Sequence, residues 1–386
     1  MPIKLPFFTL IFLISFASVN ATLFTPALPN IAEFFNVTNN AVQHTITWFL
    51  VGYALGQLIY GPLANRFGRK PALYAGIGLQ IVSSLLCVFS SVVPSFWLLV
   101  FARFMLALGS GVGLKMTFTL VNECCDQKTA GKTTSYLMLA FAVTPGLGVA
   151  LGGYLNVHFG WVSCFYAGAI YGLLLMLLVT QLPETLKTVN KNALQLNYLV
   201  DGYGAQFKNF KLVVGGLLMG GATSFFYAFA ALAPFIAITI YGLNSAEYGA
   251  ANIIPCVGLF MGSLLCAQLT KHYELKSLLR PGLFITLSGI ISMAVMMWLK
   301  LSVLFAIFLP MVLIYFGLSF IMAVTSTITM AKANDKAYGS AVMSFLNMGS
   351  ATMVVLSVGA FTVHAMLLPA VFLGLCVAMF GLVWLI

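Results

Sequence analysis

Apolar runs of about twenty residues recur along the whole chain, and they restrict its fold more than any other feature. A helix of that length crosses a hydrocarbon core about 30 Å thick, and it satisfies its own backbone polar groups inside lipid. We therefore predict an all-α membrane protein with twelve transmembrane helices. The predicted spans cover about residues 5–27, 43–63, 72–92, 96–120, 135–156, 162–182, 211–236, 248–270, 282–299, 302–330, 338–360 and 365–386.

The composition excludes a water-soluble protein. Of the 386 residues, 61% are hydrophobic and 7% are charged, whereas a soluble domain carries roughly 25% charged residues. The chain has seven cysteines, an odd number, and they lie inside apolar runs or beside loops. Neither a disulfide framework nor a metal site is therefore expected, and no cofactor is expected.

The distribution of the basic residues explains the net charge of +10. When the amino terminus is placed in the cytosol, most lysine and arginine residues fall in cytosolic loops, as the positive-inside rule requires. We therefore predict a multi-pass protein of the bacterial inner (cytoplasmic) membrane with both termini cytosolic. The charge indicates orientation in the lipid bilayer, and no nucleic-acid partner is expected.

One long polar stretch, residues 183–211, divides the apolar runs into two groups. It predicts an N-terminal six-helix bundle over residues 1–182, a cytosolic linker over 183–210 and a C-terminal six-helix bundle over 211–386. An internal repeat supports this division, because Gly52-x-x-x-Gly56 recurs in the second half as Gly258-x-x-x-Gly262. Two halves of the same topology place a substrate site between them, near the membrane midplane.

A glycine-rich basic segment at residues 61–71 follows the second span. It resembles the cytosolic loop motif between spans two and three of the major facilitator superfamily. The segments at 26–29, 52–58, 145–155 and 182–185, together with Arg103 in the fourth span, resemble more narrowly the Bcr/CflA drug-resistance group of that superfamily. The resemblance covers nearly the whole chain, with the motifs in the same order.

This resemblance implies the major facilitator fold of two pseudo-symmetric six-helix bundles. It implies a monomeric secondary active transporter that exports drugs or metabolites by alternating access, with protons as a candidate coupling ion. It also implies two groups of gating residues, although topological anchoring at the anionic inner leaflet is an alternative role for the basic ones. The residues are Gly61, Asn65, Arg66, Arg69 and Lys70 in the loop, and Pro145, Gly152 and Gly153 in the fifth span.

The sequence departs from the family pattern in its acidic residues. Asn65 occupies a loop position where the superfamily has a carboxylate, and Thr22 stands where the drug-resistance group commonly has an aspartate. All eight carboxylates of the chain fall in loops or at span ends. A proton-coupled exporter of cations usually needs a buried acid, and no carboxylate of this sequence falls at midplane depth.

Two basic residues lie within the predicted fourth span. Arg103 has no acidic neighbour on its helix, and a guanidinium facing lipid would be costly, so we expect it to project into a wet cleft between the bundles. There it either contacts substrate or coupling ion, or it braces neighbouring helices through their carbonyl groups. Lys115 either extends to the inner interface or forms a second cationic site. Together they suggest an alternative function, the transport, including import, of an anionic metabolite or siderophore.

Other residues that could contact a small-molecule substrate follow from helical spacing. In each case, ordinary packing between helices is the alternative. The residues are Asn20 and Phe24 in the first span, Tyr53 and Gln57 in the second, Phe226 and Tyr227 in the seventh and Asn347 in the eleventh.

An enzyme is not expected, because the sequence has no nucleotide-binding loop, metal-ligand cluster or paired carboxylates at membrane depth. A receptor that keeps the fold of a carrier without transporting its ligand remains a distant alternative.

Overall fold

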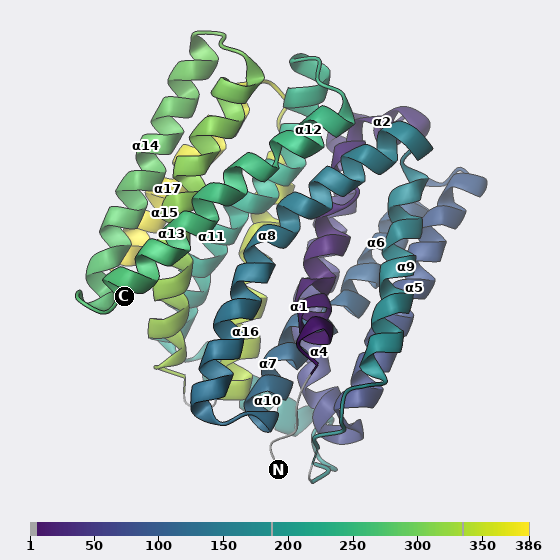
Figure 1. Ribbon diagram of the computed structural model, residues 1–386, viewed down its shortest axis with the longest axis vertical. Helices are drawn as coiled ribbons and strands as arrows, with labels where there is room; N and C mark the ends of the chain where they lie inside the picture. The colour runs from purple at the N-terminus through teal and green to yellow at the C-terminus, as the bar shows by residue number, and fades with distance from the viewer. Residues whose placement is uncertain (1–5, 187, 334–335, 386) are drawn as a thin grey trace.

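The computed structural model describes residues 6–186, 188–333 and 336–385, and these residues form helices without any strand (Figure 1). Within this part of the chain, eleven helical segments are long and apolar enough to cross a membrane, and one shorter apolar helix, Leu367–Val383, follows them. The prediction of an all-α membrane protein is confirmed. Eleven of the twelve predicted spans correspond to full-length segments and the last to this short helix.

The first half contains the first six spans, and short breaks divide three of them. In chain order its elements are α1 (Phe7–Thr22), η1 (Thr25–Ala27), α2 (Leu28–Phe34), α3 (Asn39–Val42), α4 (His44–Phe67), α5 (Arg69–Val92), α6 (Phe96–Ser110), α7 (Val112–Cys124), α8 (Gln127–Phe159) and α9 (Val162–Val179).

A separate helix, α10 (Leu196–Phe207), lies between the sixth and seventh spans. The remaining elements are α11 (Phe210–Pro234), η2 (Phe235–Ile240), α12 (Ser245–Ala251), α13 (Ile253–Leu269), η3 (Leu275–Leu278), α14 (Leu279–Trp298), η4 (Leu304–Phe308), α15 (Leu309–Met330), α16 (Lys336–Val358) and α17 (Leu367–Val383).

The first span breaks at Pro26. Because proline has no N–H, the carbonyl of Thr22 loses its helical donor, and the hydroxyl of Thr25 donates a 2.8 Å hydrogen bond to it instead. The chain then continues as a single 3₁₀ turn and α2. This break leaves the last turn of α1 inside the bundle, where other helices reach its carbonyl groups.

Close contacts at glycines hold the fourth span against the second and third. This span was predicted as one helix, but it breaks at Gly111 into α6 and α7. A Cβ on Gly109 would lie 2.6 Å from the carbonyl oxygen of Gly76 on α5, and a Cβ on Gly56 would lie 2.9 Å from that of Leu108. Small residues let helix backbones approach this closely in lipid, where burial of apolar surface does not drive association.

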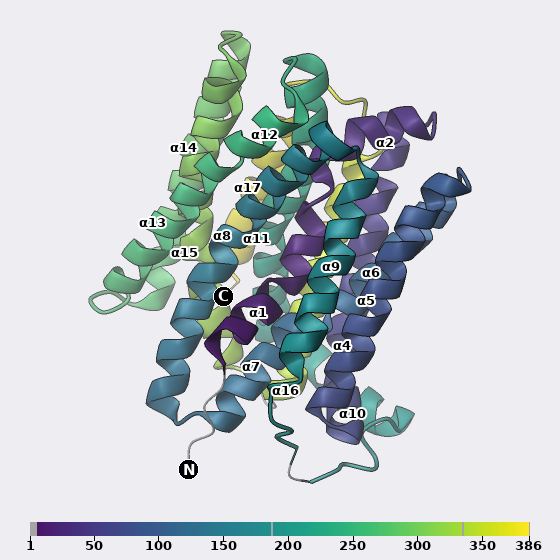
Figure 2. The same ribbon diagram turned by 45° about the vertical axis from the view of Figure 1, so that its right-hand side comes forward.

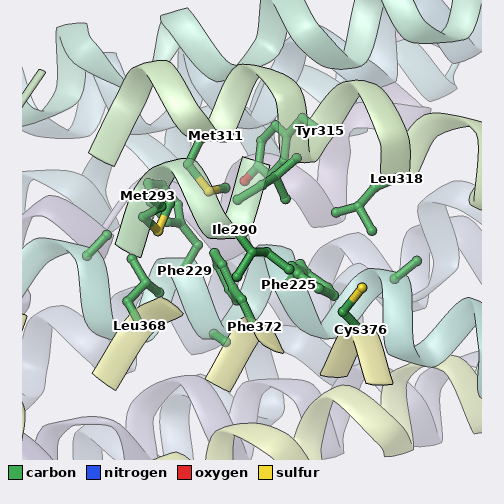
Figure 3. Close-up of a cluster of buried hydrophobic side chains, with 14 of the residues drawn as sticks. Phe225, Phe229, Ile290, Met293, Met311, Tyr315, Leu318, Leu368, Phe372 and Cys376 are labelled. Atoms are coloured by element: carbon green, nitrogen blue, oxygen red, sulfur yellow. The ribbon is translucent and has the colours of Figure 1, made fainter. Parts of the chain in front are cut away.

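Two large clusters of buried side chains lie at different places in the molecule. One belongs mostly to the second half, and Figure 3 shows Phe225 and Phe229 of α11 packed against residues of α14, α15 and α17, among them Phe372. The other joins both halves, because it contains Phe24 and Phe49 together with Phe235 and Ala351. The interface between the halves is therefore apolar at its centre.

Three pairs of helices pack across the interface between the halves: α8 with α12, α8 with α13, and α4 with α16. Figures 1 and 2 show α10 and the N-terminus at one end of the molecule and α2 at the opposite end. These are named the α10 end and the α2 end below.

Candidate transport site and gates

Arg103, on α6, is enclosed within the molecule and is 1% exposed. Its central guanidinium carbon lies 3.7 Å from the ring centroid of Phe24 and 4.3 Å from that of Phe49. Its Nη1 donates a 2.8 Å hydrogen bond to the main-chain oxygen of Asn20. Aromatic faces attract cations, so two rings and a carbonyl surround the charge where a carboxylate would be expected.

The carbonyl that binds Arg103 is available because of the break in the first span. Asn20 lies in the last turn of α1, where carbonyl groups lack donors from their own helix. The negative end of the helix dipole lies at the same place and favours a cation. The end of α1 at Thr22 thus provides the acceptor for Arg103.

The side chain of Asn20 is held by Gln80, a fully buried residue of α5. Gln80 Nε2 donates to Asn20 Oδ1 at 2.8 Å and to the Gly168 carbonyl at 3.0 Å. Asn20 Nδ2 donates to the carbonyl of Phe16 at 2.8 Å. Gln80 therefore links spans one, three and six beside Arg103. A glutamine within an apolar run is the sequence signal that points to this contact.

The surroundings of Arg103 differ from the expected wet cleft. The cavity that borders it has a volume of about 10 Å³ and is also lined by Phe24 and Ser84, which is room for about one water molecule. Its Nε and Nη2 have no hydrogen-bond partner among the described residues. The expectation fails in this conformation because Phe24 and Phe49 occupy the space next to the guanidinium.

Residues of both halves meet beside Arg103. Phe24 and Tyr53 belong to the buried cluster that spans the halves, and Tyr227 of α11 packs against it. Tyr227 lies close enough to interact electrostatically with both Tyr53 and Arg103. The structure thus brings five predicted contact residues together, and we name them the central cluster: Asn20, Phe24, Tyr53, Arg103 and Tyr227.

Lys115 lies on α7 and contacts α4. Its Nζ donates a 3.2 Å hydrogen bond to the main-chain oxygen of Gln57, while Gln57 Nε2 donates to the Gly111 carbonyl at 3.4 Å. A Cβ on Gly61 would lie 2.6 Å from that Nζ. The ammonium group of Lys115 therefore fits against α4 only because residue 61 has no side chain. Lys115 and Gln57 therefore connect the second and fourth spans on the α10 side of the break.

Phe226 and Asn347, the two remaining predicted contact residues, lie on α11 and α16. The ring of Phe226 packs on Tyr315 of α15, with centroids 4.4 Å apart, against the core of the second half. Asn347 is half-buried on α16, and its side-chain oxygen has no partner among the described residues.

A network of charged groups joins α5, α7 and the end of the sixth span at the α10 end. Arg69 Nη2 lies 2.7 Å from Glu123 Oε1, and Arg69 Nη1 donates to the carbonyl of Ala64 and to Asn65 Oδ1 at 2.7 and 2.9 Å. The hydroxyl of Thr185 also donates to Glu123. Position 65 thus contributes an amide, and Glu123 at the end of α7 provides the carboxylate.

Glu184 binds the start of α5. Its two carboxylate oxygens accept hydrogen bonds of 3.0 Å from the main-chain N–H groups of Arg69 and Lys70. Partial burial raises the pKa of Glu184, but several main-chain donors lower it, and the net direction is downward. Gly68 has a φ of +111°, and a Cβ there would lie 2.7 Å from Glu184 Oε2. A glycine is therefore required at the turn.

The remaining basic residues of the loop are less enclosed. Lys70 Nζ donates to the carbonyl of Thr180 at 3.0 Å, and the guanidinium of Arg66 lies 5.7 Å from the ring of Phe67. The bond from Lys70 ties the loop between spans two and three to the end of span six.

At the α2 end, glycines of α8 press against two other spans. A Cβ on Gly152 would collide with the carbonyl of Leu23, and one on Gly153 with the carbonyl of Ser245 on α12. Pro145 lies on the same helix, inside α8. This contact places backbone of the first half directly against backbone of the second.

Hydrogen bonds reinforce the contact at the α2 end. Asn156 Nδ2 donates to Asn30 Oδ1 at 2.7 Å and to Ser245 Oγ at 2.9 Å. Ser245 Oγ donates to the carbonyl of Pro26 at 3.0 Å. Asn156 was not singled out in the sequence, because an asparagine near a span end carries no specific pattern.

A membrane bundle whose two halves share a buried cluster has the architecture of a carrier. The chain matches the model of the Major Facilitator Superfamily over residues 10–358 and belongs to that family. It is a secondary transporter that works by alternating access.

The chain is similar to two bacterial proteins along most of their lengths. A bicyclomycin resistance protein homolog of Haemophilus influenzae is 28% identical over 322 residues, which are 81% of this chain and 77% of the relative. Multidrug resistance protein D of Escherichia coli is 25% identical over 314 residues, 80% of this chain and 76% of the relative. The predicted resemblance to the Bcr/CflA group is confirmed.

Solved structures show the same fold. A D-xylose-proton symporter superposes with a TM-score of 0.71 at 15% identity, covering 96% of this chain and 97% of the symporter. The xylose transporter XylE of Escherichia coli, in a partially occluded inward-open conformation, gives 0.69 at 14% identity, covering 97% of each chain. These structures establish the fold alone.

Proposed function

We propose that this carrier exports lipophilic drugs or metabolites, including aromatic cations such as ethidium, across the bacterial inner membrane, with protons as the coupling ion. Both termini lie in the cytosol, and the carrier acts as a monomer. The observation that supports a broad lipophilic substrate range is the cluster shared by the halves, in which Phe24, Tyr53 and Tyr227 meet. The printed names of the relatives, which concern bicyclomycin and multidrug resistance, agree with it.

The substrate site in this proposal is the central cluster, with Gln57 beside it on α4. Binding pockets for small molecules combine aromatic surface with a few polar groups. The two bundles, residues 1–182 and 211–386 joined by the linker 183–210, rock about this site. Phe226 and Asn347 then contact substrate only after the second half has moved.

The two gates close in alternation. The basic loop, with Arg69 paired to Glu123 and Glu184, controls access at the α10 end, which is the cytosolic end in this proposal. Gly152, Gly153 and Asn156 control access at the α2 end. At the α2 end, Gly153 and Asn156 contact Ser245 of the other half, so these contacts must break when the halves separate there. At the α10 end, the contacts of Arg69 and Glu184 lie within the first half and the linker, so they brace the loop itself.

Ethidium efflux from cells tests the exporter proposal. Tyr227→Ala should lower the efflux rate at least tenfold (about 1.4 kcal/mol), because a ring shared between the halves is lost. Tyr166→Ala, which removes an exposed ring of α9, is the matched control and should have no effect. Efflux that persists at the original rate in Tyr227→Ala would overturn the assignment of the central cluster. Efflux that survives collapse of the proton gradient would exclude proton coupling.

A second candidate function is the transport of an anionic metabolite or siderophore. It is favoured by one observation, the two guanidinium nitrogens of Arg103 that have no partner among the described residues. Proteoliposomes loaded with a radiolabelled carboxylate such as citrate test it. Arg103→Ala should abolish citrate exchange in this case, while unchanged exchange would refute it.

A further inference from the structure

α4 contains a proline, Pro62, close to its α10 end. Proline has no N–H, so the carbonyl one helical turn earlier loses its donor, and here that carbonyl belongs to Leu58. The hydroxyl of Tyr203, on α10, donates a 2.7 Å hydrogen bond to it. Tyr203 therefore satisfies the main-chain oxygen that Pro62 leaves without a helical partner.

The same tyrosine contacts the other half of the molecule. Its ring meets that of Tyr338 on α16 edge to face, with centroids 4.9 Å apart and planes at 87°. A Cβ on the neighbouring Gly202 would lie 2.6 Å from the Tyr338 ring. Farther along α10, Phe207 packs edge to face on Phe345 at 6.1 Å. One face of α10 is thus fitted to α16, while Tyr203 also reaches α4.

α10 is docked more closely than a simple connection between two domains requires. Gln206 is a polar residue but is only 2% exposed. Burial, and then the neighbouring Tyr338, raise the pKa of Tyr203 well above its ordinary value. The hydroxyl therefore keeps its proton at physiological pH and remains a donor to Leu58.

We propose that α10 is a conformational strap: Tyr203 docks it onto the proline-interrupted end of α4, its other contacts hold it against α16, and it must release when the halves rock. The release of α10 during transport rests on the proposed carrier cycle. The docking of α10 does not, because it can be measured on the purified protein without transport. It predicts that Tyr203 and Pro62 are energetically coupled although they are far apart in sequence.

Limited trypsin digestion in detergent measures the docking, because the exposed Lys191 and Lys208 flank α10 and cleavage reports how often a segment opens. Tyr203→Phe removes only the hydroxyl, and it should raise the rate of cleavage at these lysines about two- to tenfold, the range for one hydrogen bond. Tyr273→Phe, at an exposed tyrosine, is the control and should leave the rate unchanged.

Pro62→Ala supplies the matching half of a double-mutant cycle. The alanine that replaces Pro62 would offer its own N–H to the carbonyl of Leu58, so Tyr203→Phe should change the cleavage rate little in this background. An equal effect of Tyr203→Phe in both backgrounds, or no effect in either, would overturn the strap.

A second pair of variants keeps the test valid if Pro62→Ala does not fold. Gly202→Ala pushes a methyl group into the Tyr338 ring and should raise cleavage severalfold. Gly204→Ala, on the same helix with open space around it, should not. Equal rates for these two variants would contradict the fitted contact with α16. Failure of ethidium efflux in the unmodified protein would affect the proposed function and leave these digestion results unchanged.

Discussion

Arg103 on α6 is bonded to the main-chain oxygen of Asn20 on α1, 2.8 Å away, at the turn where Pro26 interrupts the first span. A buried cation is thus held by the end of a helix and by two aromatic rings, groups that do not titrate near neutral pH. Tyr203 likewise binds a main-chain carbonyl of a distant helix, that of Leu58, which Pro62 leaves without its helical donor.

Arg103→Met should preserve folding and abolish ethidium efflux. The desolvation of a buried charge is costly, so an apolar side chain of similar length is often neutral or better for stability. We expect the free energy of unfolding to change by about 1 kcal/mol or less, as measured by thermal unfolding in detergent. A loss of about 3 kcal/mol or more would instead identify Arg103 as a structural brace.

Glu123→Gln should destabilise the α10 end. Arg69 would keep its contacts with Ala64 and Asn65 but lose its ionic partner, which we expect to cost about 1–2 kcal/mol because Glu123 is partly exposed. Denaturant unfolding measures this cost. Glu274→Gln, at an exposed glutamate in the second half, is the control and should change stability by no more than about 0.5 kcal/mol. Equal effects of the two variants would argue against the ion pair.

Protonation of Glu184 at low pH should lower the free energy of unfolding of the α10 end. Main-chain donors lower the pKa of this carboxyl in the folded state. A depressed carboxyl pKa stabilises the fold above the unfolded value of about 4.3, and this stabilisation is lost as pH falls through the folded pKa. Thermal unfolding from pH 7 downward should show this decline in the unmodified protein and a shallower one in Glu184→Gln. Identical profiles would count against the assignment.

Gly153→Ala should weaken the closure at the α2 end. The new methyl group would collide with the carbonyl of Ser245, which forces α8 and α12 apart. We expect a loss of about 1–3 kcal/mol in thermal stability and a slower ethidium efflux. Gly374→Ala is the matched control, because nothing lies within 4 Å of a Cβ at that glycine. A Gly153→Ala protein as stable as the control would mean that the contact is loose.

The positions of the spans could be predicted because crossing a bilayer imposes a length and an apolar composition on every helix by itself. The apolar length of the fourth span also placed Arg103 inside the membrane. A charge at that depth must contact substrate, a coupling ion or main-chain carbonyls, because lipid offers it no partner. Apolar length did not predict the break at Gly111, because a continuous apolar segment predicts a single helix even where it contains glycines.

The sequence by itself determined the helical membrane fold, its likeness to a family of carriers and the residues whose placement in lipid needs an explanation. Only the tertiary structure decided their partners. It paired Arg69 with Glu123, placed Gln80 beside Asn20, and brought Tyr203 to the carbonyl exposed by Pro62. The physical reason is that a hydrogen bond or ion pair between distant segments depends on how whole helices pack, whereas the apolar length of a span is a property of that segment alone.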